Sequence, residues 1–367
     1  MKVGILTHYN VNNQGARLQM SALRHYLEDL GHEVVILTYE KNFDFDPGEA
    51  QKNSGSLKAL PYYLKNYLLD KGPGVTVFNF RKVLAHRRSA GQYAYAPFDQ
   101  SGCDVIVIGS DEVFSIDVGC NPMMYGHGLA PIPAIAYAPS FGRTTEADLQ
   151  AFGCEDTVRS GLSELSSLSA RDLHTQEMIR SLTGREAPLV CDPVLLYAGG
   201  ALQVPLKPLR RPYMVIYSYD RHMTAPAEVA ALRAYAGAHH LMTVSLGTYH
   251  SWCDRNIVCD AEHWYSYFRD AACVVTDTFH GTIAAIKNHC NTAVFFRPGI
   301  NGFKLRSLLA ELGLESRRLE SLTAEELERV LSAPTDYAAV DTHLAEMARR
   351  SGNYLKDALE RAYAQHH

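Results

Sequence analysis

The 367-residue sequence has no apolar run close to the roughly 18 residues that a membrane-spanning helix needs. It also lacks the layout of a secretory signal peptide, because Thr7 and His8 interrupt the apolar part of the opening MKVGILTHYN. The opening instead has the pattern of a first β-strand. We therefore expect a cytosolic protein.

No CxxC pair occurs among the eight cysteines, and several of them lie inside apolar segments. Buried free thiols are therefore expected rather than disulfides. A zinc site could be assembled only from the widely spaced His250, Cys253, Cys259 and His263. Structural zinc ligands usually come in closely spaced pairs, so no metal site is predicted.

An excess of positive charge is also absent, since 35 Lys and Arg stand against 40 Asp and Glu for a net charge of −5. This balance argues against nucleic acid as a partner. Any anionic substrate must therefore meet a local cluster of cations. The length of 367 residues is too great for one ordinary core, so about two domains are expected.

The chain does contain an alternation of strand-like and helix-like segments over almost its whole length. Strand-like segments are predicted at residues 2–6, 34–39, 104–108, 134–138, 165–170, 189–191, 213–219, 241–246, 273–276 and 293–296. Segments of helical periodicity separate most of them. This order predicts an α/β fold with parallel sheets.

A stretch rich in glycine and proline, AGGALQVPLKPLRRP, lies between Tyr197 and Pro212, and the alternation restarts after it. Such a composition is typical of a linker. We therefore predict two tandem Rossmann-like domains with a cleft between them, residues 1–203 on the acceptor side and 204–339 on the donor side. A C-terminal amphipathic helix over residues 340–367 is expected to rejoin the first domain.

The stretch CVVTDTFHGTIAAI, residues 273–286, combines a buried strand, a polar turn and a helix. A turn of this kind places His280 and unpaired helix N–H groups at the carboxyl edge of a sheet, where open α/β folds bind ligands. Alternatively, Asp277 or Thr278 only caps the helix, and His280 is a turn residue whose hydrogen bonds are satisfied.

Polar residues also follow four predicted strands of the first domain. They are the residues of Gly109-Ser110-Asp111-Glu112, Pro139-Ser140, Arg171-Asp172 and Asp192-Pro193. Because the carboxyl ends of parallel strands meet at one edge of a sheet, these residues are predicted to share a rim. The loop HYNVNNQG, residues 8–15, resembles a Rossmann-type first turn but is no GxGxxG match, so no dinucleotide is predicted.

Residues 77–88 form a predicted helix with a basic outer face in Arg81, Lys82, Arg87 and Arg88. A solvated face is the usual meaning of this pattern, and docking to an acceptor or a membrane surface is the alternative. The preceding residues, 41 to about 75, are irregular apart from a short amphipathic helix near residues 62–68.

Taken together, these segments resemble the polysaccharide pyruvyl transferase family, whose fold is of the two-domain GT-B glycosyltransferase type. The matching pieces are GILTHYNVNNQGARLQMSALRHYLEDLGHEV, VIVIGSDEVF, AIAYAPSFG, LSARD, CDPVLL, VVTDTFHGT and KLRSLLAELGL. They run in family order from Val3 to about Leu314, and TDTFHGT is the most diagnostic.

The resemblance implies transfer of pyruvate from phosphoenolpyruvate to two hydroxyls of a sugar, giving a cyclic ketal. It implies that His280 is the catalytic acid and that Arg171 contacts the charged groups of the donor. The sequence departs from the family at Thr278, where some members carry an arginine. Lys304 and Arg306 are the candidates to supply that charge, with Arg297 behind them.

The reaction itself favours an imidazole. Phosphoenolpyruvate is an enol ether, and protonation of its methylene carbon creates an oxocarbenium-like centre that a sugar hydroxyl can attack. The helix N-terminus disfavours a charged His280, whereas Asp277 favours it if within reach. The N–H groups of this turn, with Thr278, Gly281 and Thr282, are predicted to hold the donor's phosphate or carboxylate. Asp111 is a candidate general base, or it only caps a turn.

The acceptor is expected to be a sugar carried by a lipid or a nucleotide. Candidate acceptor contacts are Asn10, Asn13, Gln14, Ser110 and Ser140. No cofactor is expected besides the donor substrate phosphoenolpyruvate, and no nucleic acid partner. The expected location is cytoplasmic, with peripheral contact at the inner face of the membrane as the alternative. The sequence does not specify the oligomeric state.

Two other functions stay open at this point. A GT-B glycosyltransferase that uses a nucleotide-sugar shares the architecture, and it predicts a pocket for base and ribose in the second domain. A non-catalytic glycan-binding protein of the same fold would instead tolerate replacement of His280.

Overall fold

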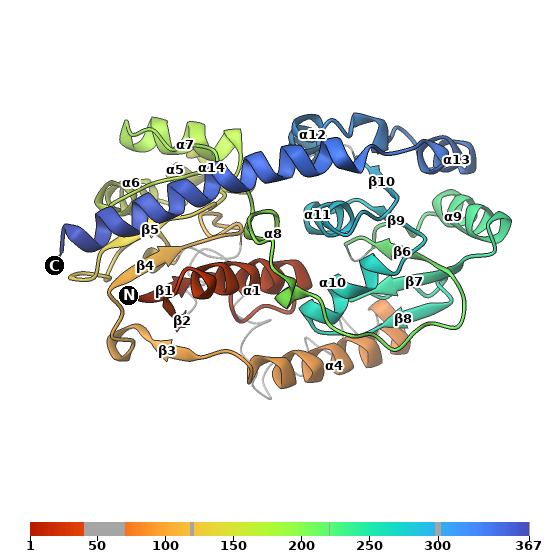
Figure 1. Ribbon diagram of the computed structural model, residues 1–367, viewed down its shortest axis with the longest axis horizontal. Coiled ribbons are helices and arrows are strands. Elements are labelled where there is room, and N and C mark those ends of the chain that lie inside the picture. Colours follow the sequence, from red (N-terminus) through yellow and green to blue (C-terminus); the bar gives the residue numbers. More distant parts are fainter. Residues whose placement is uncertain (40–69, 118–120, 220, 298–301, 367) are drawn as a thin grey trace.

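The computed structural model describes residues 1–39, 70–117, 121–219, 221–297 and 302–366, and in them two parallel sheets lie side by side with helices on their faces (Figure 1). The first sheet has the strand order β3-β2-β1-β4-β5 and the second β11-β10-β9-β6-β7-β8. Every strand pairing within each of the two sheets is parallel. The α/β class predicted from the alternation is confirmed.

The first sheet and its helices form what we call the N-terminal unit. Its strands are β1 (Lys2–Leu6), β2 (Glu33–Thr38), β3 (Tyr95–Pro97), β4 (Val105–Ile108) and β5 (Ala134–Ala136). Its helices are α1 (Gln14–Asp29), α4 (Asp70–Ala90), α5 (Glu146–Ala151), α6 (Glu155–Glu164), α7 (Leu173–Thr183) and α8 (Pro193–Leu196). The inner strand β4 consists of four buried β-branched residues, as expected of a parallel strand covered on both faces.

The second sheet and its helices form the C-terminal unit. Its strands are β6 (Tyr213–Tyr217), β7 (Met242–Leu246), β8 (Arg255–Ile257), β9 (Cys273–Thr276), β10 (Thr292–Phe295) and β11 (Arg318–Leu319). Its helices are α9 (Pro226–Ala238), α10 (Ala261–Arg269), α11 (Phe279–Lys287), α12 (Gly302–Glu311) and α13 (Ala324–Ser332). Strand β9 pairs with β10 on one side and β6 on the other, so the turn that follows it lies near the middle of the sheet edge.

The last helix, α14 (Tyr337–Ala364), spans both units (Figure 1). Its first turn contacts the C-terminal unit, where the Tyr337 hydroxyl donates to the Cys290 carbonyl at 2.7 Å. Further along, the Tyr354 hydroxyl donates to the Ala136 carbonyl of β5 at 3.1 Å. The division into domains at residues 203 and 204 stays a prediction. Within the described residues, none of the helices is long and apolar enough to cross a bilayer.

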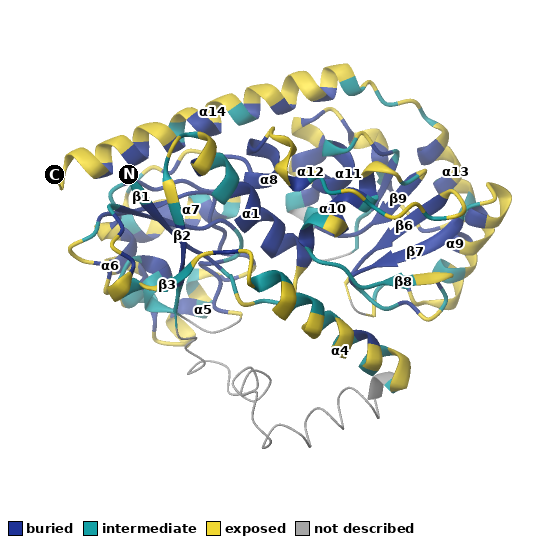
Figure 2. Cartoon of the chain, turned by 60° about the horizontal axis from the view of Figure 1, so that its bottom comes forward, coloured by how far each residue is buried: buried dark blue, intermediate teal, exposed yellow. Residues whose placement is uncertain are grey.

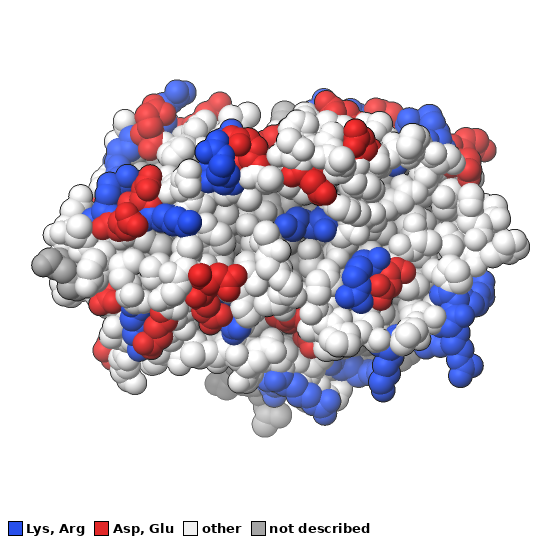
Figure 3. Space-filling model, viewed as in Figure 1, with Lys and Arg blue, Asp and Glu red and all other residues white. Residues whose placement is uncertain are grey.

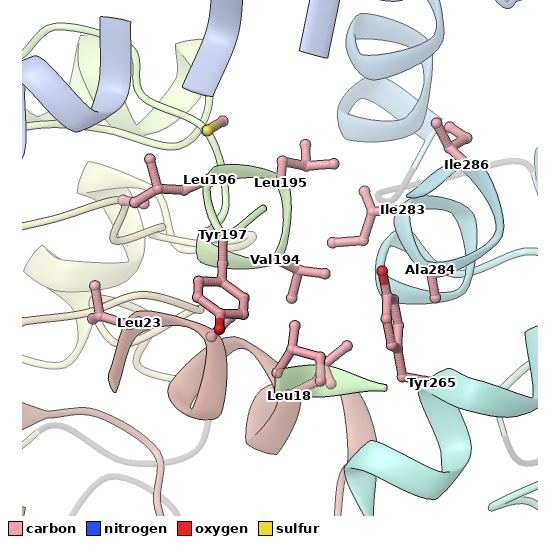
Figure 4. Packing of buried hydrophobic residues seen from close by; sticks show 14 of the residues in the cluster. Leu18, Leu23, Val194, Leu195, Leu196, Tyr197, Tyr265, Ile283, Ala284 and Ile286 are labelled. Atoms are coloured by element: carbon pink, nitrogen blue, oxygen red, sulfur yellow. The ribbon is translucent and has the colours of Figure 1, made fainter. Parts of the chain in front are cut away.

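One hydrophobic cluster continues from the first unit into the second, and buried residues line both sheets (Figure 2). Figure 4 shows its centre, where Leu18 of α1, Val194 of α8 and Ile283 of α11 point toward one another. All three side chains are fully buried. Burial of apolar surface at this junction fixes the start of α11 relative to α1 and α8.

The strands predicted at residues 165–170 and 189–191 were wrong as regular strands. They form only isolated parallel bridges: residues 165–170 pair through Ser167 with Ile135 and through Ala170 with Leu189, and residues 189–191 pair through Leu189 alone. Pro188 has no N–H to extend the ladder, although its carbonyl accepts from Ala170 N at 3.0 Å. These short pairings still bring the residues that follow them to the sheet edge. The helix predicted near residues 62–68 lies outside the described residues.

Candidate active site

The turn after β9 is held together by its own threonines. Thr278 caps α11, because its hydroxyl accepts from Gly281 N at 3.0 Å, and the Thr282 hydroxyl donates to the Thr278 carbonyl at 2.8 Å. A Cβ on Gly281 would lie 2.4 Å from Thr276 Oγ1, so no larger residue fits there. The capping interpretation of Thr278 is confirmed. The side chains of Thr278 and Thr282 are buried and hydrogen-bonded within the turn, and their use as donor ligands stays a prediction.

His280, in the first turn of α11, lies against the N-terminal unit. A Cβ on Gly15 of α1 would be only 2.4 Å from the imidazole Cγ, so the backbone of Gly15 packs directly on the ring. The side chain of His280 is 14% exposed, and its Nε2 is 3.6 Å from Asp192 Oδ2. The imidazole therefore lies at the contact between the units, next to an acidic group.

Arg171 is the buried cation of this cluster. Its guanidinium, 5% exposed, donates to Asp192 Oδ2 at 3.0 Å and lies 3.4 Å from Asp111 Oδ1. A buried charge is tolerated when opposite charges and hydrogen bonds compensate it, and the two carboxylates provide both. The predicted rim is confirmed here, because residues that follow three different segments meet at one guanidinium.

The two carboxylates are ionised at neutral pH. Burial raises the pKa of Asp111, but the charges of Arg171, His280 and His8 outweigh burial and lower that pKa to about 2. Burial likewise opposes ionisation of Asp192, and the nearby imidazole of His280 and the charge of Arg171 lower its pKa. Asp111 also has a left-handed backbone with φ of 82°, a conformation that non-glycine residues rarely adopt and that recurs at functional sites.

Lys304 of α12 crosses from the C-terminal unit to the rim of the N-terminal unit. Its Nζ donates to Glu112 Oε1 and to Ser140 Oγ, both at 2.8 Å, and lies 3.7 Å from Asp172 Oδ2. The Ser140 hydroxyl donates in turn to Asp172 Oδ2 at 2.6 Å. The Lys304 side chain is 13% exposed, so an ammonium group lies at the same contact between units as His280.

Two other predicted cations lie elsewhere. Arg306 is exposed on α12, and no contact joins it to this cluster among the described residues. Arg297 donates to Asp277 Oδ2 at 2.8 Å and to both oxygens of Glu228. His222 Nδ1 is also 2.7 Å from Asp277 Oδ2. Asp277 is therefore engaged with these two partners, and the carboxylate beside the catalytic candidate is Asp192 instead.

The predicted acceptor contacts are also separated. Asn10 is exposed in the first loop, and Asn13 is exposed but caps α1 by accepting from Gly15 N at 2.9 Å. Gln14 is buried and donates to the Cys259 carbonyl at 3.3 Å, which links the two units. Ser110 and Ser140 are fully buried and hydrogen-bonded within the rim, so their side chains hold the loops rather than face a ligand.

A small hollow lies between the units on the side of α1 that faces α4. It is lined by Asn12, Asn13, Gln14, Arg17, Lys82, His86, Ser89, Cys259, Asp260 and Ala261. Lys82 therefore lies on the inner side of α4, which corrects its predicted place on the outer face. Residues four apart lie on one side of a helix, so Lys82 shares the inner side of α4 with Phe78 and His86. The prediction was wrong because it grouped Lys82 with the neighbouring arginines.

Sequence reasoning placed Asp192 in the rim but gave it no part in the chemistry, and it gave no role to Gly15. The signal for Asp192 was its position directly after a buried segment in CDPVLL, the same arrangement that marked Asp111. Nothing local indicated that it, and not Asp277, would lie beside His280. The need for glycine at position 15 is visible only when the two units are placed together.

Comparison with known proteins gave one family and one fold. The family model described as polysaccharide pyruvyl transferase matches residues 13–295. The glycosyltransferase SnogD from Streptomyces nogalater is similar over 98% of this chain and 99% of its own, with 19% identity and a TM-score of 0.50. UGT89C1 from Arabidopsis thaliana, complexed with quercetin, matches over 100% and 99% of the two chains with 12% identity and a TM-score of 0.50. These structures share the GT-B fold. No curated protein matches the sequence.

Proposed function

Because the chain belongs to the polysaccharide pyruvyl transferase family, we propose that it moves pyruvate from phosphoenolpyruvate to a sugar of a polysaccharide or glycolipid precursor. The product is a ketal that joins two hydroxyls of the sugar. The observation that carries the proposal is the imidazole of His280, 3.6 Å from Asp192 Oδ2 and close to the buried Arg171. A proton donor, its counter-ion and a cation for an anionic donor substrate are thereby brought together.

The proposed reaction begins with transfer of a proton from the imidazolium of His280 to the methylene carbon of phosphoenolpyruvate. The former enol carbon becomes electron-deficient, and a sugar hydroxyl adds to it as it loses its own proton. Phosphate then leaves, and the second hydroxyl adds to the same carbon to close the ketal. One hydroxyl proton restores His280 and the other leaves on the phosphate as hydrogen phosphate, so atoms and charge balance in this scheme.

Asp192 and Asp111 take different parts in this scheme. Asp192 stabilises the positive charge on the His280 ring through a contact that excludes most water. Asp111 has its carboxylate 15% exposed at the rim and ionised at neutral pH, and it accepts the proton of the attacking hydroxyl. Both carboxylates also keep the Arg171 guanidinium in place.

Lys304 and Arg171 are proposed to bind the anionic groups of the donor. Lys304 is paired with Glu112, and of the two only Glu112 is exposed, with 44% of its side chain accessible, so its carboxylate can turn into solvent. A donor phosphate can therefore replace Glu112 at the ammonium group for a small cost. The backbone N–H groups at the start of α11 supply further positive potential for the same anion.

The acceptor is proposed to approach over the first loop of the N-terminal unit, where Asn10 and Asn13 are exposed. The carrier of the acceptor sugar is a lipid or a nucleotide. The proposed location is the cytoplasm, with peripheral contact at the inner face of the membrane as the alternative.

A nucleotide-sugar glycosyltransferase is the second candidate, and one surface feature favours it. A hollow of the C-terminal unit is lined by the aromatic rings of Tyr249 and Trp252 and by Arg221 and Arg233. Aromatic faces and guanidinium groups are suited to a nucleobase and its phosphates. Calorimetric titration with UDP, GDP and phosphoenolpyruvate separates the two candidates, since our proposal requires binding of phosphoenolpyruvate.

The test of the proposal is turnover with phosphoenolpyruvate and a panel of lipid-linked and nucleotide-linked sugars, followed by the pyruvyl mass gain and phosphate release. We expect His280→Ala to lower kcat by about 10² to 10⁴-fold, as for loss of a general acid, while donor binding is largely kept. The matched control is His343→Ala, which removes an exposed histidine of α14. Unchanged turnover in His280→Ala would contradict the assignment.

A further inference from the structure

The outer face of α4 carries an unusual concentration of exposed apolar side chains. The described residues include nine exposed large hydrophobic side chains, and four of them lie on this helix between positions 77 and 84. They are Val77 at 59% exposed, Phe80 at 65%, Val83 at 39% and Leu84 at 38%. Single exposed apolar residues are normal on a protein surface, but a contiguous group marks an interaction site.

These side chains form a ridge with cations on both sides. Val77, Phe80 and Leu84 are spaced by three and four residues, so they lie along one line of the helix. At 100° per residue, Arg81 and Arg88 lie on one flank of this line and Arg87 on the other. All three arginines are exposed. An apolar ridge flanked by arginines is the pattern of a helix that lies in a membrane interface.

The opposite face of α4 is already committed to the rest of the protein. Phe78 is 6% exposed, and its ring centroid lies 5.7 Å from that of Tyr249 in the C-terminal unit. Arg17 of α1 and His86 approach to 2.8 Å. Rotation of the helix to bury its outer ridge would break these contacts, so the ridge stays exposed in the isolated chain (Figure 2).

Helix α4 carries a net positive charge, whereas the whole chain carries a net negative charge. The segment Asp70–Ala90 contains one acidic residue and five Lys and Arg, in a chain of net charge −5. Figure 3 shows Lys and Arg along the lower edge, where α4 lies, and both signs mixed along the upper edge. Within the described residues, no ion pair neutralises Arg81, Arg87 or Arg88, whereas Arg349 of α14 is paired with Glu346. The outer face of α4 is therefore open to an anionic partner.

We propose that the outer face of α4 docks on an anionic lipid bilayer. Val77, Phe80 and Leu84 enter the boundary between headgroups and acyl chains, and the three arginines bind lipid phosphates. A second copy of this chain does not fit as well, because a symmetric contact would place the arginines of one copy against those of the other.

If the proposed pyruvyl transfer holds, docking in this orientation also determines how the acceptor reaches the site. The inner side of α4 lines the hollow that also includes Asn12 and Asn13. Gly15 follows two residues after Asn13, in the first turn of α1, and its backbone contacts His280. A sugar carried by a membrane lipid would thus reach the imidazole from the side on which α4 meets the bilayer.

The proposal is tested by flotation of the full chain with vesicles of phosphatidylcholine alone and of phosphatidylcholine with phosphatidylglycerol. We expect binding only to the second kind, weakened by about tenfold or more when the salt concentration is raised. Phe80→Ser combined with Leu84→Ser, and separately the triple change Arg81→Glu, Arg87→Glu and Arg88→Glu, should each lower binding by about tenfold or more. Because these positions are exposed, the melting temperature should not change.

Matched controls are Leu173→Ser, which removes a side chain 55% exposed on α7, and the triple change Arg349→Glu, Arg350→Glu and Arg361→Glu on α14. Both should bind like the unchanged protein. Absence of binding to anionic vesicles, or equal binding by the α4 variants, overturns the proposal. A dimer in light scattering that the Phe80 and Leu84 changes dissociate would instead identify the ridge as a contact between two copies. Vesicle binding does not depend on catalysis, so its failure leaves the proposed reaction standing.

Discussion

Asp192 shows how one buried carboxylate connects several parts of the site. It accepts from Val194 N at 2.9 Å and so caps α8, it accepts from Arg171, and it lies 3.6 Å from His280 Nε2. The side chain is completely buried, so each of these contacts acts in a medium of low dielectric constant. The position of His280, the charge of Arg171 and the start of α8 thus depend on one residue.

Asp111 leads to a prediction about acid stability. Its pKa in the folded protein is about 2, below its ordinary value of 3.8, so the ionised form is favoured by folding. A carboxylate whose pKa is lowered by folding stabilises the folded state at any pH above its pKa in the unfolded chain. This stabilisation is lost as the pH falls through its pKa in the folded protein. The contribution, about 2 kcal/mol, should be fully present above about pH 4 to 5 and lost toward pH 2. Asp111→Asn should flatten the free energy of unfolding against pH in this window.

Urea unfolding between pH 2 and 5 measures this effect. Asp336→Asn, a change of an exposed capping aspartate of α14, is the control and should leave the pH profile as it is. An identical pH profile in Asp111→Asn and the unchanged protein would show that the Arg171 pair does not stabilise the folded state.

At the scale of elements, the periodicity of the sequence predicted the parts that are long or central. The strand at residues 273–276 and the helix after it were predicted where β9 and α11 lie. The short strands β3, β8 and β11 at or near the sheet edges were missed, because two or three residues carry no recognisable period. The meeting of the polar strand ends could be predicted, because parallel strands end at one edge of the sheet. The sequence could not predict that Asp192, and not Asp277, would lie beside His280.

The contact between the starts of α1 and α11 gives a prediction at this scale. In Gly15→Ala the new methyl group would lie 2.4 Å from the imidazole of His280, so the ring or the helix must move. Overpacking of this kind costs about 1 to 3 kcal/mol, and displacement of the ring from Asp192 should lower kcat by about tenfold or more. Activity with phosphoenolpyruvate and thermal unfolding measure the two effects.

The matched control is Gly237→Ala in α9, where a Cβ meets nothing within 4 Å. This change should leave activity unaffected and stabilise the helix by about 0.5 to 1 kcal/mol. If Gly15→Ala behaves in the same way, the close packing of Gly15 on His280 is wrong.

At the scale of the whole molecule, one core extends through both units and α14 lies along them. We therefore expect thermal unfolding in a single cooperative transition. Leu355→Ala, at a fully buried position of α14, should lower the free energy of unfolding by about 2 to 5 kcal/mol while the transition stays single. Lys356→Ala, at the exposed neighbouring position, is the control and should change little. Two separate calorimetric transitions in the unchanged protein would contradict a shared core.

His280 and Lys304 are supplied by the C-terminal unit, while Gly15, Asp111, Arg171 and Asp192 belong to the N-terminal unit. The C-terminal unit expressed alone would therefore contain His280 without Asp192. The N-terminal unit expressed alone would contain Asp192 and Arg171 without the imidazole of His280. Modular recombination, in which one unit is exchanged with that of a relative to alter acceptor choice, must preserve pairs of residues across the junction rather than either partner alone.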